Sequence, residues 1–187
     1  MRAFIAVELP EGVRQALGQM QRELAVARAD VKWVEQENLH VTMRFLGEIT
    51  EEQRQAVERL LTRIAAHTPP IQVRLSELGA FPSVASPRII WVGIEMGHEV
   101  LAAIASELAE GLVSLEIPPE ERPFTAHVTL GRVRSPKNQG QLTTQLRELN
   151  WKSPQPFCAE GLTLFQSTLS ASGPIYTALA TCAFGGR

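Results

Sequence analysis

Two short segments of the chain carry the same pair of polar residues. His40-Val41-Thr42-Met43 and His127-Val128-Thr129-Leu130 each place a histidine two residues before a threonine, between apolar neighbours. Residues i and i+2 of a β-strand share one face, so each histidine and its threonine point the same way while the apolar residues face a core. Chance would give about 0.26 such triplets for 4 His and 12 Thr among 187 residues. Two copies in matching apolar frames therefore indicate a functional site.

These residue types suit acid-base chemistry on a phosphate. A neutral imidazole can take a proton from water while a protonated one gives a proton to a leaving alkoxide, and an unperturbed pKa of about 6.5 keeps both forms available. Threonine hydroxyls can donate to the non-bridging oxygens of a phosphorus held between the two pairs. An acid and a base on opposite sides of the phosphorus would favour in-line displacement.

The two pairs belong to an internal repeat. His40-Val41-Thr42 and His127-Val128-Thr129 are 87 residues apart, and the apolar segments that begin at Phe4 and Trp91 have the same separation. A shared offset indicates a duplication, and a pseudo-two-fold axis between the copies would bring both pairs to one cleft. We expect a single bilobal domain over residues 1–187, with repeats at about 1–70 and 88–150 and a C-terminal hairpin at 157–184 that completes the sheets.

Apolar periodicity predicts the elements that position these pairs. Helical spacing predicts helices over about 11–24, 51–64, 100–112 and 142–149, and extended patterns predict strands at 4–7, 32–34, 39–45, 71–81, 91–96, 127–130, 157–166 and 175–184. The predicted fold class is α+β, with two pseudo-symmetric lobes, each an antiparallel sheet with helices packed on its outer side, and an active-site cleft between them.

Composition excludes several classes of protein. The net charge is −2, which argues against a strongly basic coat for nucleic acid, and no stretch has the roughly 20 apolar residues that a membrane helix requires. An acidic residue, Glu8, follows the first apolar residues too early for a signal peptide, so we expect a cytoplasmic location. Cys158 and Cys182 form no metal-ligand motif and are expected to be reduced, although hairpin pairing would bring them close together.

Other interpretations of single residues are less specific. Two histidines without nearby carboxylates or cysteines fall short of a three-ligand zinc site, so no metal is expected. His67 and His98 lack a partner motif and are expected on the surface. Four aromatic residues could stack on a nucleobase, although core packing is the simpler interpretation: Trp33, Phe81, Phe124 and Tyr176.

Nearly the whole chain resembles the two-histidine phosphoesterases, and within them the RNA 2',3'-cyclic phosphodiesterases, also called LigT-like 2'-5' RNA ligases. The resemblance rests on both motifs and on the segments 4–7, 33–34, 37–47, 79–82, 122–124 and 173–176. It implies metal-independent hydrolysis of RNA 2',3'-cyclic phosphate ends to 2'-phosphates without a cofactor, with His40 as proton donor and His127 as proton acceptor. Reversible 2'-5' ligation and a non-catalytic RNA-end binding module are the alternatives.

The resemblance also implies a basic residue after each motif. Arg44 and Arg132 are therefore candidates for binding phosphate. Strand alternation predicts that Arg44 shares the face of His40, whereas Arg132 would face away from its histidine unless Gly131 permits a bulge, which we expect. The expected partners are RNA ends with a 2',3'-cyclic phosphate, such as tRNA fragments, or small cyclic nucleotides, and the expected state is a monomer without membrane or metal.

Overall fold

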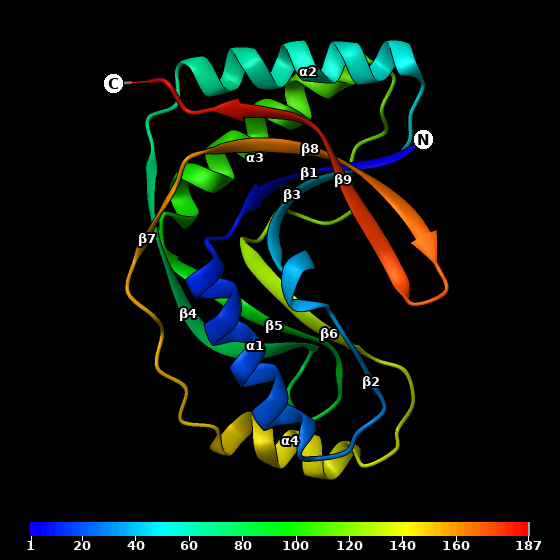
Figure 1. Cartoon of the computed structure of the whole chain (residues 1–187), viewed down its shortest axis with the longest axis vertical. Helices are drawn as coiled ribbons and strands as arrows, with labels where there is room; N and C mark the ends of the chain where they lie inside the picture. Colours follow the sequence, from blue (N-terminus) through cyan, green and yellow to red (C-terminus); the bar gives the residue numbers. More distant parts are fainter. Residues whose placement is uncertain (187) are drawn as a thin grey trace.

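The computed structural model describes residues 1–186, which form one curled sheet covered by helices (Figure 1). The helices are α1 (Glu11–Ala25), α2 (Glu51–Ala66), α3 (His98–Val113) and α4 (Gln139–Glu148), and a 3₁₀ turn, η1 (Gln36–Asn38), precedes the first motif. The strands are β1 (Arg2–Glu8), β2 (Val31–Trp33), β3 (His40–Glu48), β4 (Ile71–Pro82), β5 (Pro87–Met96), β6 (His127–Val133), β7 (Phe157–Ala159), β8 (Gly161–Ser170) and β9 (Gly173–Ala183).

The sheet consists of two halves that meet at the two motif strands. Its order is β7-β4-β5-β6-β3-β1-β8-β9, with every neighbouring pair antiparallel and β2 paired to β6. β3 and β6 are joined through a single residue pair, Val41 with Val128. The first half contains β3, β1, β8 and β9, and the second contains β6, β5, β4, β7 and β2. This arrangement confirms the predicted α+β fold with pseudo-symmetric lobes.

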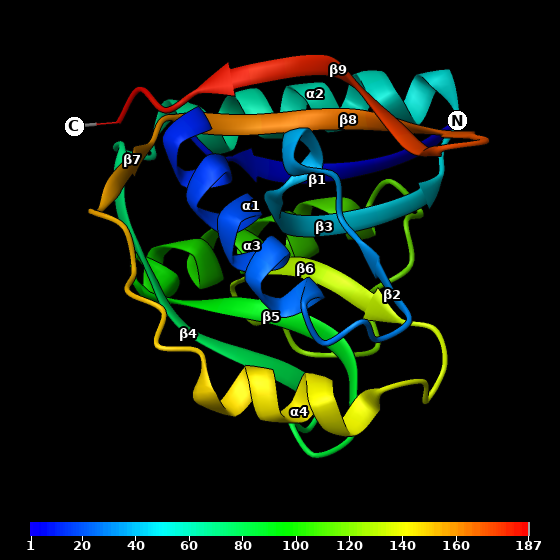
Figure 2. The same ribbon diagram turned by 60° about the horizontal axis from the view of Figure 1, so that its bottom comes forward.

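The first helix of each repeat packs over the half of the sheet that contains the motif strand of the other repeat. α1 packs against α4, and the buried Gln21 of α1 donates to the carbonyl of Leu130 in β6 at 2.9 Å. α3 packs against α2 and against β3 of the first half, and it also contacts β5 of its own half. Figures 1 and 2 show α1 beside α4 and α2 beside α3. The two repeats therefore exchange helices.

The helix sequences explain where the helices begin and what they bury. α2 begins with a capping box, in which the Thr50 hydroxyl accepts from the Gln53 backbone and the Gln53 side chain accepts from the Thr50 backbone. Apolar residues at helical spacing line one face of each helix. They pack against the face of the sheet that the helices cover and form a single core with it. The opposite face of the strands, which we call the site face, carries the polar residues of the motifs.

The C-terminal region differs from the prediction. The expected strand at 157–166 is interrupted at Glu160, so that β7 pairs with β4 in the second half while β8 pairs with β1 in the first. Cys158 lies opposite Gln72, and Cys182 lies opposite Leu162. The expectation that hairpin pairing brings the two cysteines together is therefore wrong, and both are free thiols.

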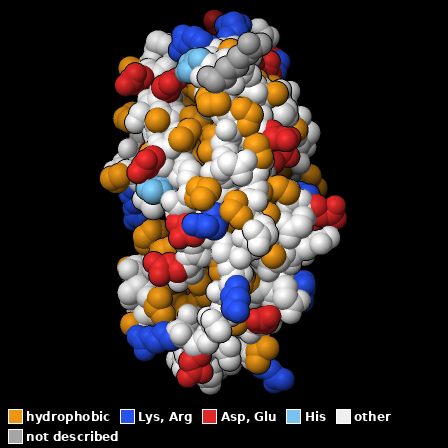
Figure 3. Space-filling model, turned by 90° about the vertical axis from the view of Figure 1, so that its left-hand side faces the viewer, with side chains coloured by type: hydrophobic (Ala, Val, Ile, Leu, Met, Phe, Trp, Pro, Cys, Tyr) orange, Lys and Arg blue, Asp and Glu red, His pale blue; other side chains and the backbone are white. Residues whose placement is uncertain are grey.

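Among the residues that the structure describes, the outer surface over β4 and β7 carries no patch of a single charge. Figure 3 shows positive and negative side chains scattered among apolar ones on this side of the molecule. His67 and His98 are exposed, as predicted. No helix within residues 1–186 is long and apolar enough to cross a membrane.

Candidate active site

His40 opens β3 and is held at both ring nitrogens. Its Nδ1 lies 2.6 Å from the carbonyl oxygen of Asn38, and its Nε2 lies 2.7 Å from Oγ1 of Thr42. A carbonyl oxygen only accepts, so Nδ1 carries the hydrogen in the neutral ring and Nε2 accepts from the threonine hydroxyl. Nε2 is therefore the nitrogen that can exchange a proton with a substrate.

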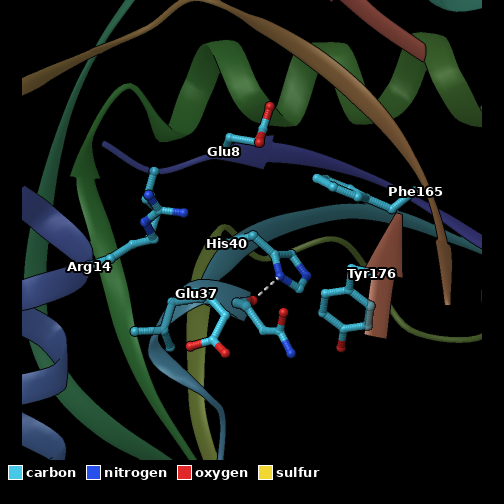
Figure 4. Close-up of a pocket in the computed structure, with 9 residues that line it drawn as sticks. Glu8, Arg14, Glu37, His40, Phe165 and Tyr176 are labelled. Carbon is cyan, nitrogen blue, oxygen red and sulfur yellow. Dashed lines mark hydrogen bonds between the residues drawn. The ribbon is translucent and has the colours of Figure 1, made fainter. Parts of the chain in front are cut away.

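An aromatic cluster surrounds the His40 ring. Phe4 of β1 stacks on it with ring centroids 5.0 Å apart, and Tyr176 of β9 meets it edge-on at 5.6 Å. Phe165 of β8 stacks on the other side of this cluster, 5.4 Å from Phe4. His40 lines an open pocket, and Figure 4 shows Tyr176 beside its ring and Arg14 across the pocket.

Burial lowers the pKa of His40 below its ordinary value. Desolvation by the surrounding side chains is the largest cause, because a charged imidazole loses its water there. The Nδ1 hydrogen bond to the Asn38 carbonyl partly opposes this change, and the positive charge of His127 adds to it. Val41 and Val128, which follow the two histidines, pair across β3 and β6, so the histidines lie near each other.

His127 opens β6 in the same way but has a more open environment. Its Nδ1 lies 2.7 Å from the carbonyl of Thr125, which is 87 residues after Asn38, so the repeat preserves this contact. The nearest aromatic ring is that of Phe81, edge-on at 6.2 Å. Neither His127 Nε2 nor the Thr129 hydroxyl makes a hydrogen bond within residues 1–186. Both therefore stay free to contact a substrate.

A bulge in β3 corrects the expected position of Arg44. Thr42 pairs with Ala6 and Arg44 with Ile5, which leaves Met43 as an extra residue. Arg44 consequently turns to the core side, where it is 6% exposed and donates from Nη2 to the carbonyl of Pro118 at 2.5 Å. The prediction that Arg44 shares the face of His40 is therefore wrong.

The expected bulge in β6 is confirmed, and it lies at the equivalent position. Gly131 pairs with Ile90 and Thr129 with Trp91, so Leu130 is the extra residue. Arg132 consequently lies on the site face. Gly131 has a packing reason as well, because a Cβ there would lie 2.7 Å from Cγ1 of Val31. The two bulges turn Phe45 and Arg132, rather than Arg44 and Gly131, to the site face beside the motifs.

Several contributors to the site were not predicted from the sequence. Phe4 and Phe165 support the His40 ring, and Gln21 donates to the bulge carbonyl of Leu130. The offset of 87 that aligns Phe4 with Trp91 is a signal that could have identified Phe4. Of the four aromatic candidates, Tyr176 touches His40 and Phe81 touches His127, whereas Trp33 and Phe124 pack against the core.

The described residues of the site do not form a three-ligand metal group. Within residues 1–186, no three His, Cys, Asp or Glu side chains gather closely enough to hold a metal ion. The site instead offers two imidazoles with their Nδ1 atoms fixed by carbonyls and two threonine hydroxyls. This set can accept a proton, donate a proton and stabilise negative charge on a bound anion.

Known proteins have sequences and folds similar to those of this chain. A protein of Methanothermobacter thermautotrophicus named RNA 2',3'-cyclic phosphodiesterase is 33% identical over 177 residues, which cover 95% of both chains. A Thermus thermophilus protein of the same name is 35% identical and covers 96% of this chain and 88% of its own. The crystal structure of the Thermus thermophilus protein TT0787 superposes with a TM-score of 0.83 at 32% identity over all of both chains.

The family model of the LigT like phosphoesterases matches the chain twice, at residues 7–91 and 92–176. Each match contains one histidine motif, and together they account for most of the sequence. The duplicated strands, the paired motifs and these matches agree. The chain belongs to the LigT-like phosphoesterase family.

Proposed function

We propose that this chain is an RNA 2',3'-cyclic phosphodiesterase that opens the cyclic phosphate to a 2'-phosphomonoester. The observation that carries the proposal is the matched fixation of the two histidines. In both, a main-chain carbonyl two residues earlier binds Nδ1, which leaves Nε2 as the reactive atom. The relatives named RNA 2',3'-cyclic phosphodiesterase support the substrate class.

In the proposed reaction, His127 Nε2 takes a proton from a water molecule as that water attacks phosphorus. The bond from phosphorus to O3' breaks, and His40 Nε2 delivers its proton to O3'. The hydroxyls of Thr42 and Thr129 donate to the non-bridging oxygens, where negative charge increases in the transition state. The products are a 2'-phosphate and a free 3'-hydroxyl, and no metal or cofactor takes part.

The lowered pKa of His40 fits a proton donor that is charged only when substrate is present. In the free site, burial keeps the ring mainly neutral near pH 7, with its Nε2 accepting from Thr42. An anionic phosphate beside the ring favours the protonated form, because opposite charges at close range raise a histidine pKa. Protonation of His40 would then accompany substrate binding.

Ligation is the second candidate function. The geometry favours it specifically because both histidines are fixed through the same nitrogen, so that either can serve as acid or base. In ligation, the 5'-hydroxyl of another RNA would replace water and attack the phosphorus of the cyclic phosphate while one histidine takes its proton. The bond from phosphorus to O3' would break, O3' would take a proton from the other histidine, and a 2'-5' linkage would form. Assays at a high concentration of RNA ends distinguish hydrolysis from joining, and a non-catalytic RNA-end binding module would show neither reaction.

The direct test is incubation of the protein with an RNA that ends in a 2',3'-cyclic phosphate, followed by phosphorus NMR. We expect a 2'-phosphate, formed at an undiminished rate after exhaustive EDTA treatment. A predominant 3'-phosphate would show that the acid and base roles, or the orientation of the ligand, are reversed. Activity that is lost on chelation and restored by zinc or magnesium would contradict the two-histidine mechanism.

The proposal includes a monomeric enzyme that acts on RNA ends in the cytoplasm. The free thiols of Cys158 and Cys182 agree with a reducing compartment. Light scattering of the purified protein tests the monomer. Tracking a tagged chain in its own cells tests the location.

A further inference from the structure

A second pair of aromatic rings lies beside His127, on the site face of the second half. Trp91 of β5 is the direct partner of Thr129 in the β5–β6 ladder, and directly opposite residues of a sheet share a face. Phe81 of β4 packs against the indole with ring centroids 5.3 Å apart, and it meets the His127 ring edge-on at 6.2 Å. We call Phe81 and Trp91 the aromatic platform. It adjoins the second catalytic pair directly.

Glycines in the two strands let the indole lie against the sheet. Gly79 is the partner of Trp91 in the β4–β5 ladder, and a Cβ there would lie 2.4 Å from Cη2 of the indole. Gly93, opposite His127, would bring a Cβ to 3.4 Å from Cζ3. A larger residue at position 79 would therefore push the indole away from the strands. The backbone of β4 and β5 is thus shaped to hold this ring.

The indole N–H of Trp91 has no hydrogen-bond partner. It is buried, yet no acceptor lies within reach among residues 1–186. A buried tryptophan N–H normally finds a partner, because an unsatisfied donor destabilises the fold. A side chain without this donor would serve packing alone equally well. A requirement for a large flat ring beside Thr129 explains why a tryptophan stands at this position.

The first repeat uses its equivalent ring differently. Phe4, which precedes Trp91 by the repeat offset of 87 residues, is 3% exposed, because the aromatic cluster around His40 encloses it. Among the described residues, Phe81 is the only aromatic ring that packs on Trp91, and Phe81 itself is 40% exposed. The second repeat therefore keeps an accessible ring beside its histidine, whereas the first repeat buries its own.

The reaction geometry determines what this accessible ring can contact. The attacking and leaving oxygens lie in line on opposite sides of phosphorus. When His127 takes the proton, any group attached to the attacking oxygen therefore lies on the His127 side. Water carries no group that could use an aromatic ring. The 5'-hydroxyl of a nucleoside carries a base, and bases stack on phenylalanine and tryptophan rings. The platform thus favours a nucleoside as the attacking group.

We propose that Phe81 and Trp91 form the site for an acceptor nucleoside whose 5'-hydroxyl attacks the cyclic phosphate. This inference rests on the proposed function and locates the second substrate of ligation. The 5'-oxygen bonds to phosphorus as His127 takes its proton, the bond from phosphorus to O3' breaks, and O3' takes the proton of His40. The product is a 2'-5' linkage with a free 3'-hydroxyl. When such a linkage is cleaved, the platform holds the nucleoside that leaves.

The test measures how a cyclic phosphate partitions between water and an alcohol. The protein is incubated with a 2',3'-cyclic mononucleotide and an equal concentration of either adenosine or 2-methoxyethanol, and transfer and hydrolysis products are separated. For the wild type we expect the ratio of transfer to hydrolysis to be roughly 10-fold to 100-fold higher with adenosine, because its base stacks on the platform. Phe81→Leu should lose most of this preference, and Phe81→Tyr, which keeps the ring, should retain it.

Phe45→Leu is the matched control. It removes a phenylalanine that is 56% exposed on the site face of the other half, beside the first motif. Transfer and hydrolysis are measured within one reaction, so an overall loss of activity does not alter their ratio. We expect Phe45→Leu to keep the wild-type preference for adenosine. A wild type without this preference, or equal ratios in Phe45→Leu and Phe81→Leu, would overturn the acceptor site.

Binding measurements separate the acceptor site from the proposed function. With a nucleoside 2'-monophosphate in excess, added adenosine should shift the indole N–H resonance of Trp91, which Trp91→Phe identifies in nitrogen NMR spectra. Trp33 and Trp151 are internal controls. In Phe81→Leu the shift should require a roughly 10-fold higher concentration of adenosine. A wild type that hydrolyses nothing but shows the shift would refute the hydrolase and retain the acceptor site, whereas an unmoved Trp91 resonance would refute the acceptor site.

Discussion

His40 and His127 occupy equivalent positions in two repeats, yet their surroundings differ. Both are fixed by a carbonyl two residues earlier. His40, however, is enclosed by Phe4 and Tyr176 and bonded to its own threonine, whereas His127 has one edge contact and a free threonine. The duplication thus explains the shared backbone geometry. The side chains that diverged after duplication must account for any difference between the acid and the base.

Removing either histidine should have the largest effect. We expect His40→Ala or His127→Ala to lower turnover by roughly 10²-fold to 10⁴-fold, because acid and base act together in one step. The double variant should be scarcely worse than either single one. Steady-state assays with a cyclic-phosphate RNA measure this, and His98→Ala on the exposed surface is the control. Near-wild-type turnover in either single variant would refute the assignment.

The threonines should have smaller and unequal effects. We expect Thr42→Val and Thr129→Val to lower kcat by roughly 10-fold to 100-fold each, since each removes one of several donors to the phosphate. Valine keeps the branched shape that suits a strand. Thr42→Val should also change the pKa of His40, because the Thr42 hydroxyl is bonded to its ring in the free site. An unchanged pKa of His40 in Thr42→Val would contradict this contact.

The pKa of His40 in the absence of substrate tests how its surroundings differ from those of His127. Carbon or nitrogen NMR of the histidine rings should place the pKa of His40 below 6.5, with desolvation as the main cause. His127→Gln removes a neighbouring positive charge and should therefore raise the pKa of His40. His67→Gln, on an exposed helix end, should leave it unchanged. A pKa of His40 at or above 6.5 in the wild type would show that desolvation does not lower it.

The smallest expected effect is on stability. The folded-state pKa of His40 lies below its unfolded value of 6.5, so the unfolded chain binds more protons in between. The contribution of His40 to the free energy of unfolding is therefore lost as the pH falls below about 6.5 and levels off below the folded-state pKa. The difference in the free energy of unfolding between wild type and His40→Gln, measured by denaturant titration, should be constant above this window and change within it. Parallel pH profiles would contradict the shift.

The sequence predicted the motifs and most of the elements because apolar periodicity and an exact repeat are local signals. Residue alternation alone misplaced Arg44, since the bulge at Met43 shifts Arg44 and Phe45 to the other face. The β6 bulge was predictable because Gly131 is a recognisable break in the pattern. Met43 gives no such signal, because an apolar residue fits a regular strand and a bulge equally well.

The pairing of strands far apart in the chain could also not be predicted from the sequence. Phe157 to Gln166 has the character of one strand, and nothing local shows that Glu160 separates two strands in different halves. The support of His40 by Phe4 and Tyr176 joins residues far apart in the chain, so spacing could not reveal it. The exchange of α1 and α3 depends in the same way on how the repeats dock rather than on the sequence of either helix.

That exchange makes the two repeats inseparable as folding units. A chain cut between them would leave each motif strand without the helix that covers it, and therefore with bare apolar surface. Amide hydrogens near Val41 and Val128, where the halves join, should exchange with solvent only through unfolding of the whole molecule. Two copies of a single ancestral repeat could bury the same surfaces by trading helices across a two-fold axis. Fusion of such a dimer into one chain would have freed each histidine to specialise.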